Sequence, residues 1–322
     1  MSTVRALHLV FLIAGIAIGV LITTVIYPPT QSTVSNLIEQ RALGKYTSPL
    51  LECDAFEPLP PQQLAKLKRA INNIKKSYES RAIISLYVRG LANGGAIVFE
   101  EKDTEFDAAS LMKLPVYIAL MKRIELKPEL VDVKLTAYEG SLPEQNIEGG
   151  TPVKPGEELT INEFIERAII DSDNRAIKTL RDYIGMYAIN DVLRDHGLVS
   201  ADAQESYQIT PQEYSAFLRV LYNATYLKTE SSEKVLQMLT QSKFERGIRS
   251  GVPNDIPIAH KFGEQTVDSP LGRSYELHDC GIVYSSRPYV ICIMTKGESF
   301  DLLYKIMRTV SSKTYAVMNS ED

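Results

Sequence analysis

Two β-rich stretches at opposite ends of the chain enclose a long stretch of helical pattern, and this order constrains the fold more than any other feature. Residues 82–88 and 96–100 are strand-like, and the Asn-Gly-Gly sequence at residues 93–95 favours a turn between them. The strand pattern returns after Pro257, in residues 258–263, 276–284 and 289–296. We therefore expect one sheet built from both ends of the module, with a helical insert between them.

Apolar periodicity and capping signals predict the helices. Apolar residues recur at helical spacing over residues 64–78, which predicts an amphipathic helix at the start of the folded module. Thr160 stands three residues before Glu163, the pattern of a capping box, which predicts a helix that leads toward Ser172. Thr210-Pro211 predicts the start of a second helix, which runs to residue 222. A last helix is expected over residues 300–310 and beyond. The expected fold class is α/β (α+β): an antiparallel sheet flanked by helices, plus a helical subdomain.

An apolar run near the amino terminus predicts a membrane anchor. Residues 6–27 hold no charged side chain, and as a helix rising about 1.5 Å per residue they would reach roughly 33 Å, enough for a hydrocarbon core of about 30 Å. The alternative is a cleaved signal peptide, but its apolar region is usually about 7–15 residues long and ends in small residues. This run ends in Val25-Ile26-Tyr27-Pro28-Pro29, so we favour an uncleaved, single-pass transmembrane helix.

The anchor divides the chain into four expected parts. These are a short cytoplasmic end (residues 1–5), the transmembrane helix (6–27), a stalk (28–61) and a folded module (62–322). Arg5 and the amino terminus place the short end inside the cell, so the module is expected on the extracytoplasmic side of the cell membrane. A cytoplasmic end of this length disfavours a transmembrane sensor, which needs a cytoplasmic domain to signal.

The charge and the cysteines argue against other classes of function. The net charge is -5 with no block of like charge, whereas nucleic acid binding needs clustered Lys and Arg. Cys53, Cys280 and Cys292 form none of the close pairs that mark zinc sites, and the four histidines are scattered. We therefore expect chemistry without a metal, a cofactor or a nucleic acid partner.

Cys280 and Cys292 fall on two strands that we expect to be neighbours, around a turn at residues 285–288. An extracytoplasmic location permits a disulfide between them. Alternatively, both are buried free thiols that behave as small apolar side chains. We favour the free thiols.

Three short motifs occur in an order that predicts an acyl-transfer site: Ser110-Leu111-Met112-Lys113, Ser172-Asp173-Asn174 and Lys261-Phe262-Gly263. Each motif alone is weak evidence. Ser231-Ser232-Glu233-Lys234 also fits the first pattern, yet it lies in a polar stretch typical of a helix start. The serine of the first motif, by contrast, directly precedes an apolar helical stretch, residues 114–121. The complete set in this order is what makes the signal specific.

The residue types fit nucleophilic catalysis. Residues three apart share a helix face, so the Lys113 amine can reach the Ser110 hydroxyl, and a serine needs a neighbouring base to take its proton. Burial and a second cation both lower the pKa of a lysine, and Lys261 could be that cation. Ser172 would relay a proton toward the leaving nitrogen. Asn174 offers a donor and an acceptor, suited to holding the lysine and a substrate amide.

Some of these residues also have a simpler structural interpretation. A serine at a helix start is commonly a cap, and a lone Lys261 is commonly a solvated strand residue. Asp173 is expected to bind backbone groups in either case. His260 and His278 are interpreted as strand residues without a catalytic role. We favour a common site because residues of the right types occur jointly.

With this layout, the motifs resemble those of the class A β-lactamases and the related penicillin-binding proteins, from about residue 62 to the C-terminus. Pro155-Gly156 and Thr210-Pro211 also stand where that family has them. The resemblance implies an active site between the helical and the β-rich parts. It implies an oxyanion hole made by the backbone N–H groups of Ser110 and Glu264, and it implies that Gly263, directly before Glu264, contacts the substrate. It also implies β-lactams or D-alanyl cell-wall peptides as substrates.

One departure from the family concerns the third motif. Phe262 stands where the family usually has threonine or serine, whose hydroxyl helps to hold a substrate carboxylate. Carboxylate recognition would then depend on Lys261, Ser172 or another cation, with Arg273 and Arg287 as candidates. For both arginines we favour the alternative of exposed loop positions.

A second departure concerns release of the acyl group. Class A β-lactamases carry a glutamate and, four residues on, an asparagine that hold the hydrolytic water. The corresponding stretch, residues 199–208, contains Glu205 alone, and Ile209 stands four residues later, so we interpret Glu205 as a surface residue. Glu166 lies on the helix leading to Ser172 and is no substitute. We expect slow release from Ser110, as in a penicillin-binding protein; the alternatives are a true β-lactamase with another water-positioning residue and a non-catalytic protein that binds cell-wall peptides.

Overall fold

The computed structural model describes residues 44–48, 60–91, 96–99, 105–142, 150–198, 207–269 and 272–320. The expected transmembrane helix, most of the expected stalk, the turn at residues 93–95 and Glu205 lie outside these ranges. No helix within the described ranges has both the length and the apolar character that crossing a bilayer requires.

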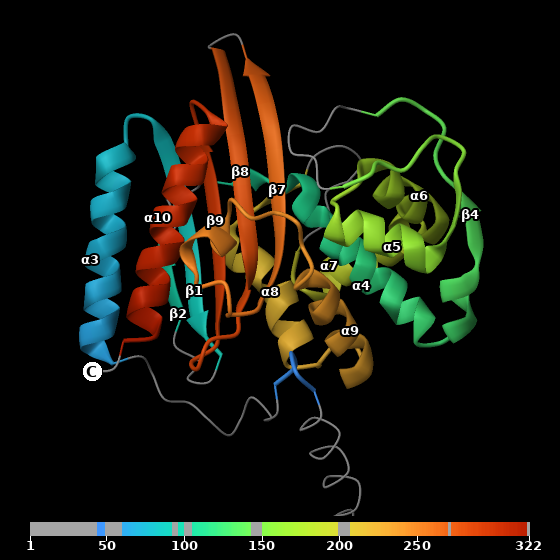
Figure 1. The fold of residues 1–322 in the computed structure, drawn as a ribbon, viewed down its shortest axis with the longest axis horizontal. Coiled ribbons are helices and arrows are strands. Elements are labelled where there is room, and N and C mark those ends of the chain that lie inside the picture. Colours follow the sequence, from blue (N-terminus) through green and yellow to red (C-terminus); the bar gives the residue numbers. More distant parts are fainter. Residues whose placement is uncertain are drawn as a thin grey trace, which may run out of the picture.

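A five-stranded sheet forms the centre of the module, with the strand order β2-β1-β9-β8-β7. Its strands are β1 (Ala82–Gly90), β2 (Ala96–Phe99), β7 (Ile258–Ser269), β8 (Gly272–Val283) and β9 (Tyr289–Gly297). All neighbouring strands are antiparallel, and β1 pairs with β9 along its whole length. The sheet therefore joins both ends of the module, as the sequence predicts (Figure 1).

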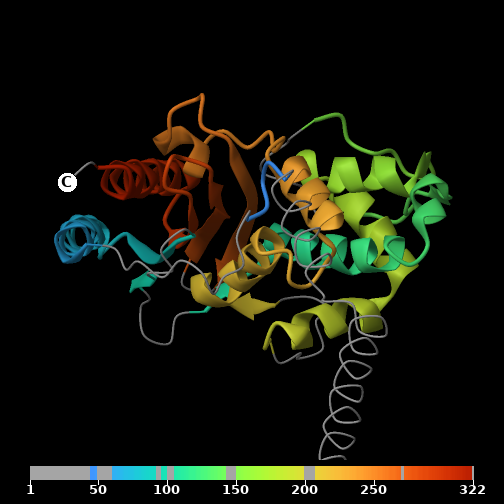
Figure 2. The same ribbon diagram turned by 90° about the horizontal axis from the view of Figure 1, so that it is seen from below.

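Two long helices, α3 (Pro61–Tyr78) and α10 (Phe300–Met318), lie side by side on one face of the sheet (Figures 1 and 2). Buried Leu67, Ile71 and Ile74 recur at helical spacing along α3 and pack into the same apolar cluster as inward-facing residues of the sheet. Each such side chain contributes about 1.5–3 kcal/mol when it is fully buried. These two helices keep water from this face.

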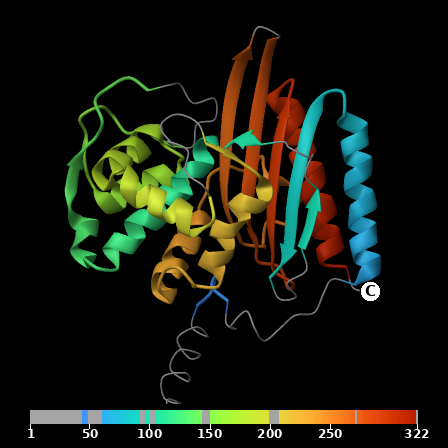
Figure 3. The ribbon, with the colours of Figure 1, turned by 180° about the vertical axis from the view of Figure 1, so that it is seen from behind.

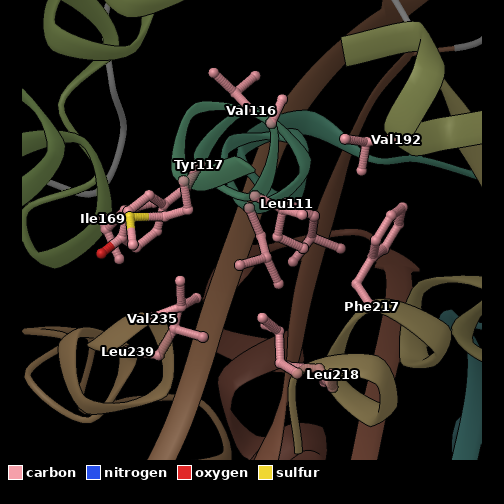
Figure 4. Close-up of a cluster of buried hydrophobic side chains, with 14 of the residues drawn as sticks. Leu111, Val116, Tyr117, Ile169, Val192, Phe217, Leu218, Val235 and Leu239 are labelled. Atoms are coloured by element: carbon pink, nitrogen blue, oxygen red, sulfur yellow. The ribbon is translucent and has the colours of Figure 1, made fainter. Parts of the chain in front are cut away.

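The opposite face of the sheet packs against the helical part, which is seen from behind in Figure 3. Its helices are α4 (Lys113–Ile124), α5 (Ile161–Ile170), α6 (Asn174–Ile184), α7 (Met186–Asp195), α8 (Pro211–Tyr222) and α9 (Thr229–Leu239). Helix α4 runs through the middle of this part and is buried on nearly every side, which accounts for its almost continuous apolar sequence. Figure 4 shows Val116 and Tyr117 on different sides of α4, in a cluster that also contains side chains from other helices, such as Phe217 and Val235.

Short elements complete the fold around this core. They are β3 (Phe106–Asp107) paired with β6 (Gln208–Ile209), β4 (Lys134–Thr136) paired with β5 (Glu158–Thr160), and the 3-10 turns η1 (Ala109–Met112), η2 (Pro128–Asp132) and η3 (Ile248–Gly251). The β3–β6 pair is continued by a hydrogen bond of 2.8 Å from the Ala108 N–H to the Tyr207 carbonyl. These bonds hold the chain immediately before Ser110.

The two helix starts predicted at Thr160 and Thr210 are confirmed. Thr160 caps α5 and Thr210 caps α8, and each accepts a hydrogen bond of 3.2 Å from the N–H of the glutamate three residues later. Each glutamate carboxylate accepts the threonine N–H in return, at 2.7 and 2.8 Å. A side-chain cap of this kind contributes about 1 kcal/mol. Strands β7 and β8 extend further than predicted, because the polar residues 264–275 lack the apolar alternation by which a strand is recognised.

Residues 44–48, within the expected stalk, pack against the module. The Glu233 carboxylate of α9 accepts hydrogen bonds from the backbone N–H groups of Lys45, Tyr46 and Thr47 at 2.7–3.0 Å. Ser48 adds a backbone hydrogen bond of 2.6 Å to the carbonyl of the last residue of α8. This short segment therefore belongs structurally to the module.

Cys280 of β8 and Cys292 of β9 form a disulfide, so the interpretation of both as free thiols is wrong. The two residues are direct cross-strand partners with a Cα–Cα distance of 3.9 Å, and both side chains are fully buried. The sequence places the cysteines on neighbouring strands but does not give the register. Only a register that puts them opposite each other brings their Cβ atoms within bridging distance.

We predict that this disulfide stabilises the sheet and leaves one free thiol in the chain. Alkylation in denaturant without reductant should modify Cys53 alone, and prior reduction should raise the number of alkylated cysteines to three by mass spectrometry. Replacing Cys280 and Cys292 together by Ala should lower the free energy of unfolding by about 2–4 kcal/mol, because the cross-link no longer restricts the unfolded chain. Cys53→Ala is the control, and three alkylated cysteines without reductant would contradict the prediction.

Candidate active site

The segment that carries Ser110 is a 3-10 turn rather than the start of an α-helix. Ser110 is half-buried in η1, and α4 begins only at Lys113. Ala109, directly before the serine, has a φ of 45°, in the left-handed region that costs a residue with a Cβ about 1–2 kcal/mol. The Asp107 carboxylate accepts a hydrogen bond from the Ala109 N–H at 2.8 Å, which helps to hold this conformation.

Lys113, the first residue of α4, is almost fully buried. Its Nζ lies 3.0 Å from Ser172 Oγ and 2.8 Å from Asn174 Oδ1, and it also donates to the Ser172 carbonyl. Burial lowers the pKa of Lys113 to about 7, against the opposing effect of the Asp173 and Glu264 carboxylates. At neutral pH a large fraction of this amine is therefore uncharged and able to accept a proton.

The second motif lies at the junction of α5 and α6. Ser172 has a φ of 58° and its side chain is fully buried. Asp173 is the N-cap of α6: its carboxylate accepts the Ala176 N–H at 2.7 Å and the Val153 N–H at 3.0 Å. The expected structural role of Asp173 is confirmed, and its two bonds fix the backbone that directs Ser172 and Asn174 toward Lys113.

Lys261 comes from β7 and is fully buried, so the alternative of a solvated strand residue is wrong. Its Nζ donates to Ser172 Oγ at 2.8 Å and to the Phe262 carbonyl at 3.1 Å. Burial, reinforced by the nearby Lys113, lowers the pKa of Lys261 well below its ordinary value, and Asp279 opposes this shift. One serine hydroxyl thus lies between two desolvated amines, one from the helical part and one from the sheet.

This arrangement provides a path for a proton. An uncharged Lys113 has one lone pair, to which Ser172 Oγ can donate its hydrogen while it accepts one from Lys261. Among the described residues, no hydrogen bond joins the Ser110 hydroxyl to the Lys113 amine. Direct transfer between these two groups therefore remains a prediction.

Strand β7 is an edge strand, and η1 packs beside it. The Cα–Cα distance of 3.9 Å marks Cys280 and Cys292 as a non-hydrogen-bonded pair, so the backbone polar groups of Cys280 point toward Lys261 on β7. By alternation along β7, the N–H of Glu264 points away from β8. The Glu264 N–H therefore points outward from the edge of the sheet, next to the η1 turn that carries Ser110. The expected oxyanion hole needs a backbone donor at this place.

Gly263 permits the close approach of β7 to η1. A Cβ at this position would lie 2.9 Å from the Ala108 carbonyl oxygen and 3.1 Å from Leu111 Cγ. Both atoms belong to the segment that carries Ser110. Gly263 thus sets the distance between the edge strand and the serine, a packing role beside the substrate contact expected from the resemblance.

Phe262 belongs to the apolar cluster on the side of the sheet that α3 and α10 cover. Its ring is buried and stacks on Phe244 with a centroid distance of 4.2 Å. The same ring lies 4.4 Å from Lys261 Nζ. An aromatic ring at this position helps to exclude water from the lysine and offers no hydrogen bond to a substrate carboxylate.

The two arginines considered for carboxylate recognition have other partners. Arg273 pairs with Asp268 at 2.7 Å near the end of the β7–β8 hairpin. Arg287 donates to the carbonyl of Ser320, close to the C-terminus. Both arginines are exposed, which agrees with the interpretation that we favour for them.

A buried polar cluster beneath η1 was missed by the sequence reasoning. His278 Nε2 donates to the Asp107 carbonyl at 3.0 Å, and the neighbouring Glu276 is also buried. His260, likewise interpreted as a plain strand residue, lies 2.9 Å from the buried Asp279 carboxylate. The position of these residues on β8 could have indicated the cluster. Charged side chains on a strand that is buried on both faces need hydrogen-bond or ion-pair partners.

Comparison with known proteins gives this geometry a context. A family model described as the beta-lactamase enzyme family matches residues 66–318. No curated protein sequence matches the chain.

Three solved structures have a similar fold. A PBP-A variant in acyl-enzyme complex with penicillin G is 21% identical, with 81% of this chain and 98% of that chain covered and a TM-score of 0.64. The TLA-3 extended-spectrum beta-lactamase is 18% identical, with 79% and 100% covered and a TM-score of 0.68. A beta-lactamase from Sphaerobacter thermophilus is 18% identical, with 79% and 97% covered and a TM-score of 0.65. These likenesses confirm the expected α+β fold.

We predict that the lowered pKa of Lys113 makes the folded module more stable at alkaline pH. Between the folded-state pKa of about 7 and the ordinary value of 10.5, the unfolded chain binds more protons at this site, so the free energy of unfolding rises with pH. Relative to Lys113→Met, the wild-type protein should gain about 2 kcal/mol between pH 7 and pH 9, since one pKa unit corresponds to about 1.4 kcal/mol. Urea unfolding at both pH values measures this difference.

The matched control is Lys234→Met, which removes an exposed amine on α9 that pairs with Glu230. Its stability difference from the wild type should not change between pH 7 and pH 9. A difference between the wild type and Lys113→Met that is also independent of pH would show that the buried amine keeps its ordinary pKa.

Proposed function

The chain belongs to the beta-lactamase enzyme family, and we propose that it cleaves amide bonds through an acyl-enzyme formed on Ser110. The main support is the position of Ser172 Oγ, between the buried amines of Lys113 and Lys261. Burial lowers the pKa of Lys113 to about 7, which suits a base near neutral pH, and burial and the nearby Lys113 also lower the pKa of Lys261.

In the proposed acylation step, the uncharged Lys113 takes the Ser110 proton, directly or through Ser172, while Ser110 Oγ attacks the carbonyl carbon. The carbonyl electron pair moves onto the oxygen, and the N–H groups of Ser110 and Glu264 stabilise this oxyanion; one such donor is typically worth about 2.7–4 kcal/mol. When the carbonyl re-forms, the C–N bond breaks. The leaving nitrogen takes a proton from Ser172 Oγ, which the protonated Lys113 replaces. The product is an ester on Ser110; the amine leaves from a peptide substrate and stays attached to the acyl group of a ring-opened β-lactam.

We propose β-lactams or D-alanyl peptides of the cell wall as the substrates. The PBP-A variant of similar fold is an acyl-enzyme complex with penicillin G, and the other two similar structures are beta-lactamases. Asn174 Oδ1 is taken by Lys113, which leaves its NH₂ group as a donor for a substrate amide. Because Phe262 offers no hydroxyl, recognition of a substrate carboxylate would depend on Lys261 and Ser172.

We propose further that the ester on Ser110 is released slowly. Hydrolysis needs a base that activates water, and the sequence offers Glu205 without an asparagine four residues later, where Ile209 stands. Glu166 is exposed on α5 and accepts a hydrogen bond from Asn162 at 2.8 Å, which supports its exclusion as a substitute. A persistent acyl-enzyme is the behaviour of a penicillin-binding protein rather than of a resistance enzyme.

We predict that a fluorescent penicillin labels the wild-type protein and that the band on a denaturing gel persists after a chase with unlabelled penicillin. Ser110→Ala should abolish the band because it removes the nucleophile. Lys113→Met should slow labelling by about 10²–10⁴-fold, the usual contribution of a general base. Ser231→Ala is the matched control, because Ser231 and Lys234 repeat the Ser-x-x-Lys spacing on α9.

Each other outcome points to a different function. A wild-type band that fades within minutes of the chase would identify a true β-lactamase with another water-positioning residue. The absence of any band, from a folded protein, would favour a non-catalytic protein that binds cell-wall peptides. Equal labelling of Ser110→Ala would overturn the assignment of the nucleophile.

We also propose that residues 6–27 anchor the module to the cell membrane, with the module on the extracytoplasmic side. The length and apolar character of this run support the proposal. We predict that the full-length protein stays with the membrane fraction after a carbonate wash and that deletion of residues 1–27 releases it. Recovery of the full-length protein in the soluble fraction at its full mass would contradict the anchor.

A further inference from the structure

Side chains from the sheet bind the main chain just before Ser110. The Glu276 carboxylate of β8 accepts the Asp107 N–H at 3.1 Å, and His278 Nε2 donates to the Asp107 carbonyl at 3.0 Å. The Asp107 carboxylate in turn accepts the Ala109 N–H at 2.8 Å. The backbone leading to Ser110 is thus held by Glu276 and His278 of β8, and by the carboxylate of Asp107 from the same segment.

These side chains form a connected cluster in which Glu276 and His278 are buried and Asp107 and Gln265 are half-buried. His278 is fully buried, and Glu276, which is also buried, pairs with Lys296 of β9 at 2.8 Å. With its amide turned to donate, Gln265 of β7 reaches both Asp107 carboxylate oxygens at 3.1 Å. Burial raises the pKa of Asp107. Buried polar groups are unfavourable unless they are hydrogen-bonded, so a polar cluster under one short turn calls for an explanation.

The turn above the cluster has a conformation that the chain does not readily adopt. Ala109 has a φ of 45°, a region sparsely populated by residues with a Cβ. Such residues keep their conformation only where the surroundings over-determine it. Relaxation of Ala109 to a negative φ would rotate the next residue, Ser110, and move its Oγ relative to Lys113 and to the edge of β7.

We propose that Asp107, held by Glu276, His278 and Gln265, is a positioning residue that keeps Ala109 left-handed and thereby aims Ser110. The inference rests on the proposed function, since the aim of Ser110 matters for acylation only if Ser110 attacks a substrate. Asp107 acts through Ala109 and takes no part in the proton transfers described above. Its loss should therefore slow the chemical step while the initial binding of substrate is retained.

Four variants of the full-length protein test this role: Asp107→Ala, Asp107→Asn, Ala109→Gly, and the double variant D107A/A109G. In stopped-flow acylation by a fluorescent penicillin, Asp107→Ala should lower the maximal acylation rate on the order of tenfold, since a 1 Å misplacement can cost about 10²-fold. The concentration of penicillin at half-maximal rate should change little. Asp107→Asn keeps an acceptor for the Ala109 N–H and should lose less than Asp107→Ala.

The double variant separates positioning from general support of the fold. Glycine populates positive φ about as readily as negative φ, so it needs no carboxylate to hold it there. D107A/A109G should therefore recover part of the rate that Asp107→Ala loses. Asp268→Asn, an exposed carboxylate of the β7–β8 hairpin, is the control and should acylate at the wild-type rate. A double variant slowed by the product of the two single effects, or an Asp107→Ala protein with the wild-type rate, would overturn the proposal.

A second measurement keeps this inference distinct from the proposed function. If the folded wild-type protein takes up no penicillin, acyl transfer fails as the function, and hydrogen exchange at the residue 109 amide then decides the positioning role. Exchange of this amide should be faster in Asp107→Ala than in Asp107→Asn or the wild type, because its acceptor is gone. Equal exchange in all three proteins would overturn the positioning role independently of any activity.

Discussion

The burial of two lysine amines against one serine hydroxyl is the interaction on which the rest of the site depends. A charged amine is costly to desolvate, and Lys113 and Lys261 are both buried within hydrogen-bonding distance of Ser172 Oγ. One amine comes from α4 and the other from β7, so they meet only because the helical part packs tightly on the sheet. The lowered pKa values are therefore a consequence of how α4, η1 and β7 pack. A loosening of that packing would admit water and return both amines to their charged form.

The same site concentrates backbone strain, and aspartates hold that strain in place. Of the three non-glycine residues with positive φ in the described ranges, Ala109 and Ser172 lie at the first and second motifs. Asp107 binds the Ala109 N–H, and Asp173, the residue after Ser172, binds the N–H groups of Ala176 and Val153. A short carboxylate can accept a nearby N–H without releasing the backbone from an unusual conformation, which suits it to this role. Each of these two strained residues thus has an aspartate within two positions whose carboxylate anchors nearby backbone.

Local signals were sufficient to predict much of this fold from the sequence. Thr160 with Glu163 marks the start of α5 because capping depends on residues three apart, and strands at both ends of the module require a common sheet. The disulfide and the cluster around Asp107 depend instead on register, which the sequence does not specify. Cys280 faces Cys292, and Glu276 lies beneath Asp107, only because β7, β8 and β9 align as they do. The three motifs were recognised for their residue types and order, whereas the strained backbone that aims them has no sequence pattern of its own.

Acylation and release depend on different parts of this chain, and this separation bears on the kind of chemistry that we propose. The groups proposed for acylation belong to η1, α4, the α5–α6 junction and β7, where a buried core and an edge strand fix them. Activation of water would instead need a base from the stretch around Glu205, whose sequence lacks the family's partner asparagine. Phe262 contributes to the same separation between acylation and release. Its ring shields Lys261 from water, and it replaces a hydroxyl that would have bound substrate. In the function that we propose, a buried site without the family's glutamate–asparagine pair in its sequence would favour transfer to the serine over transfer to water.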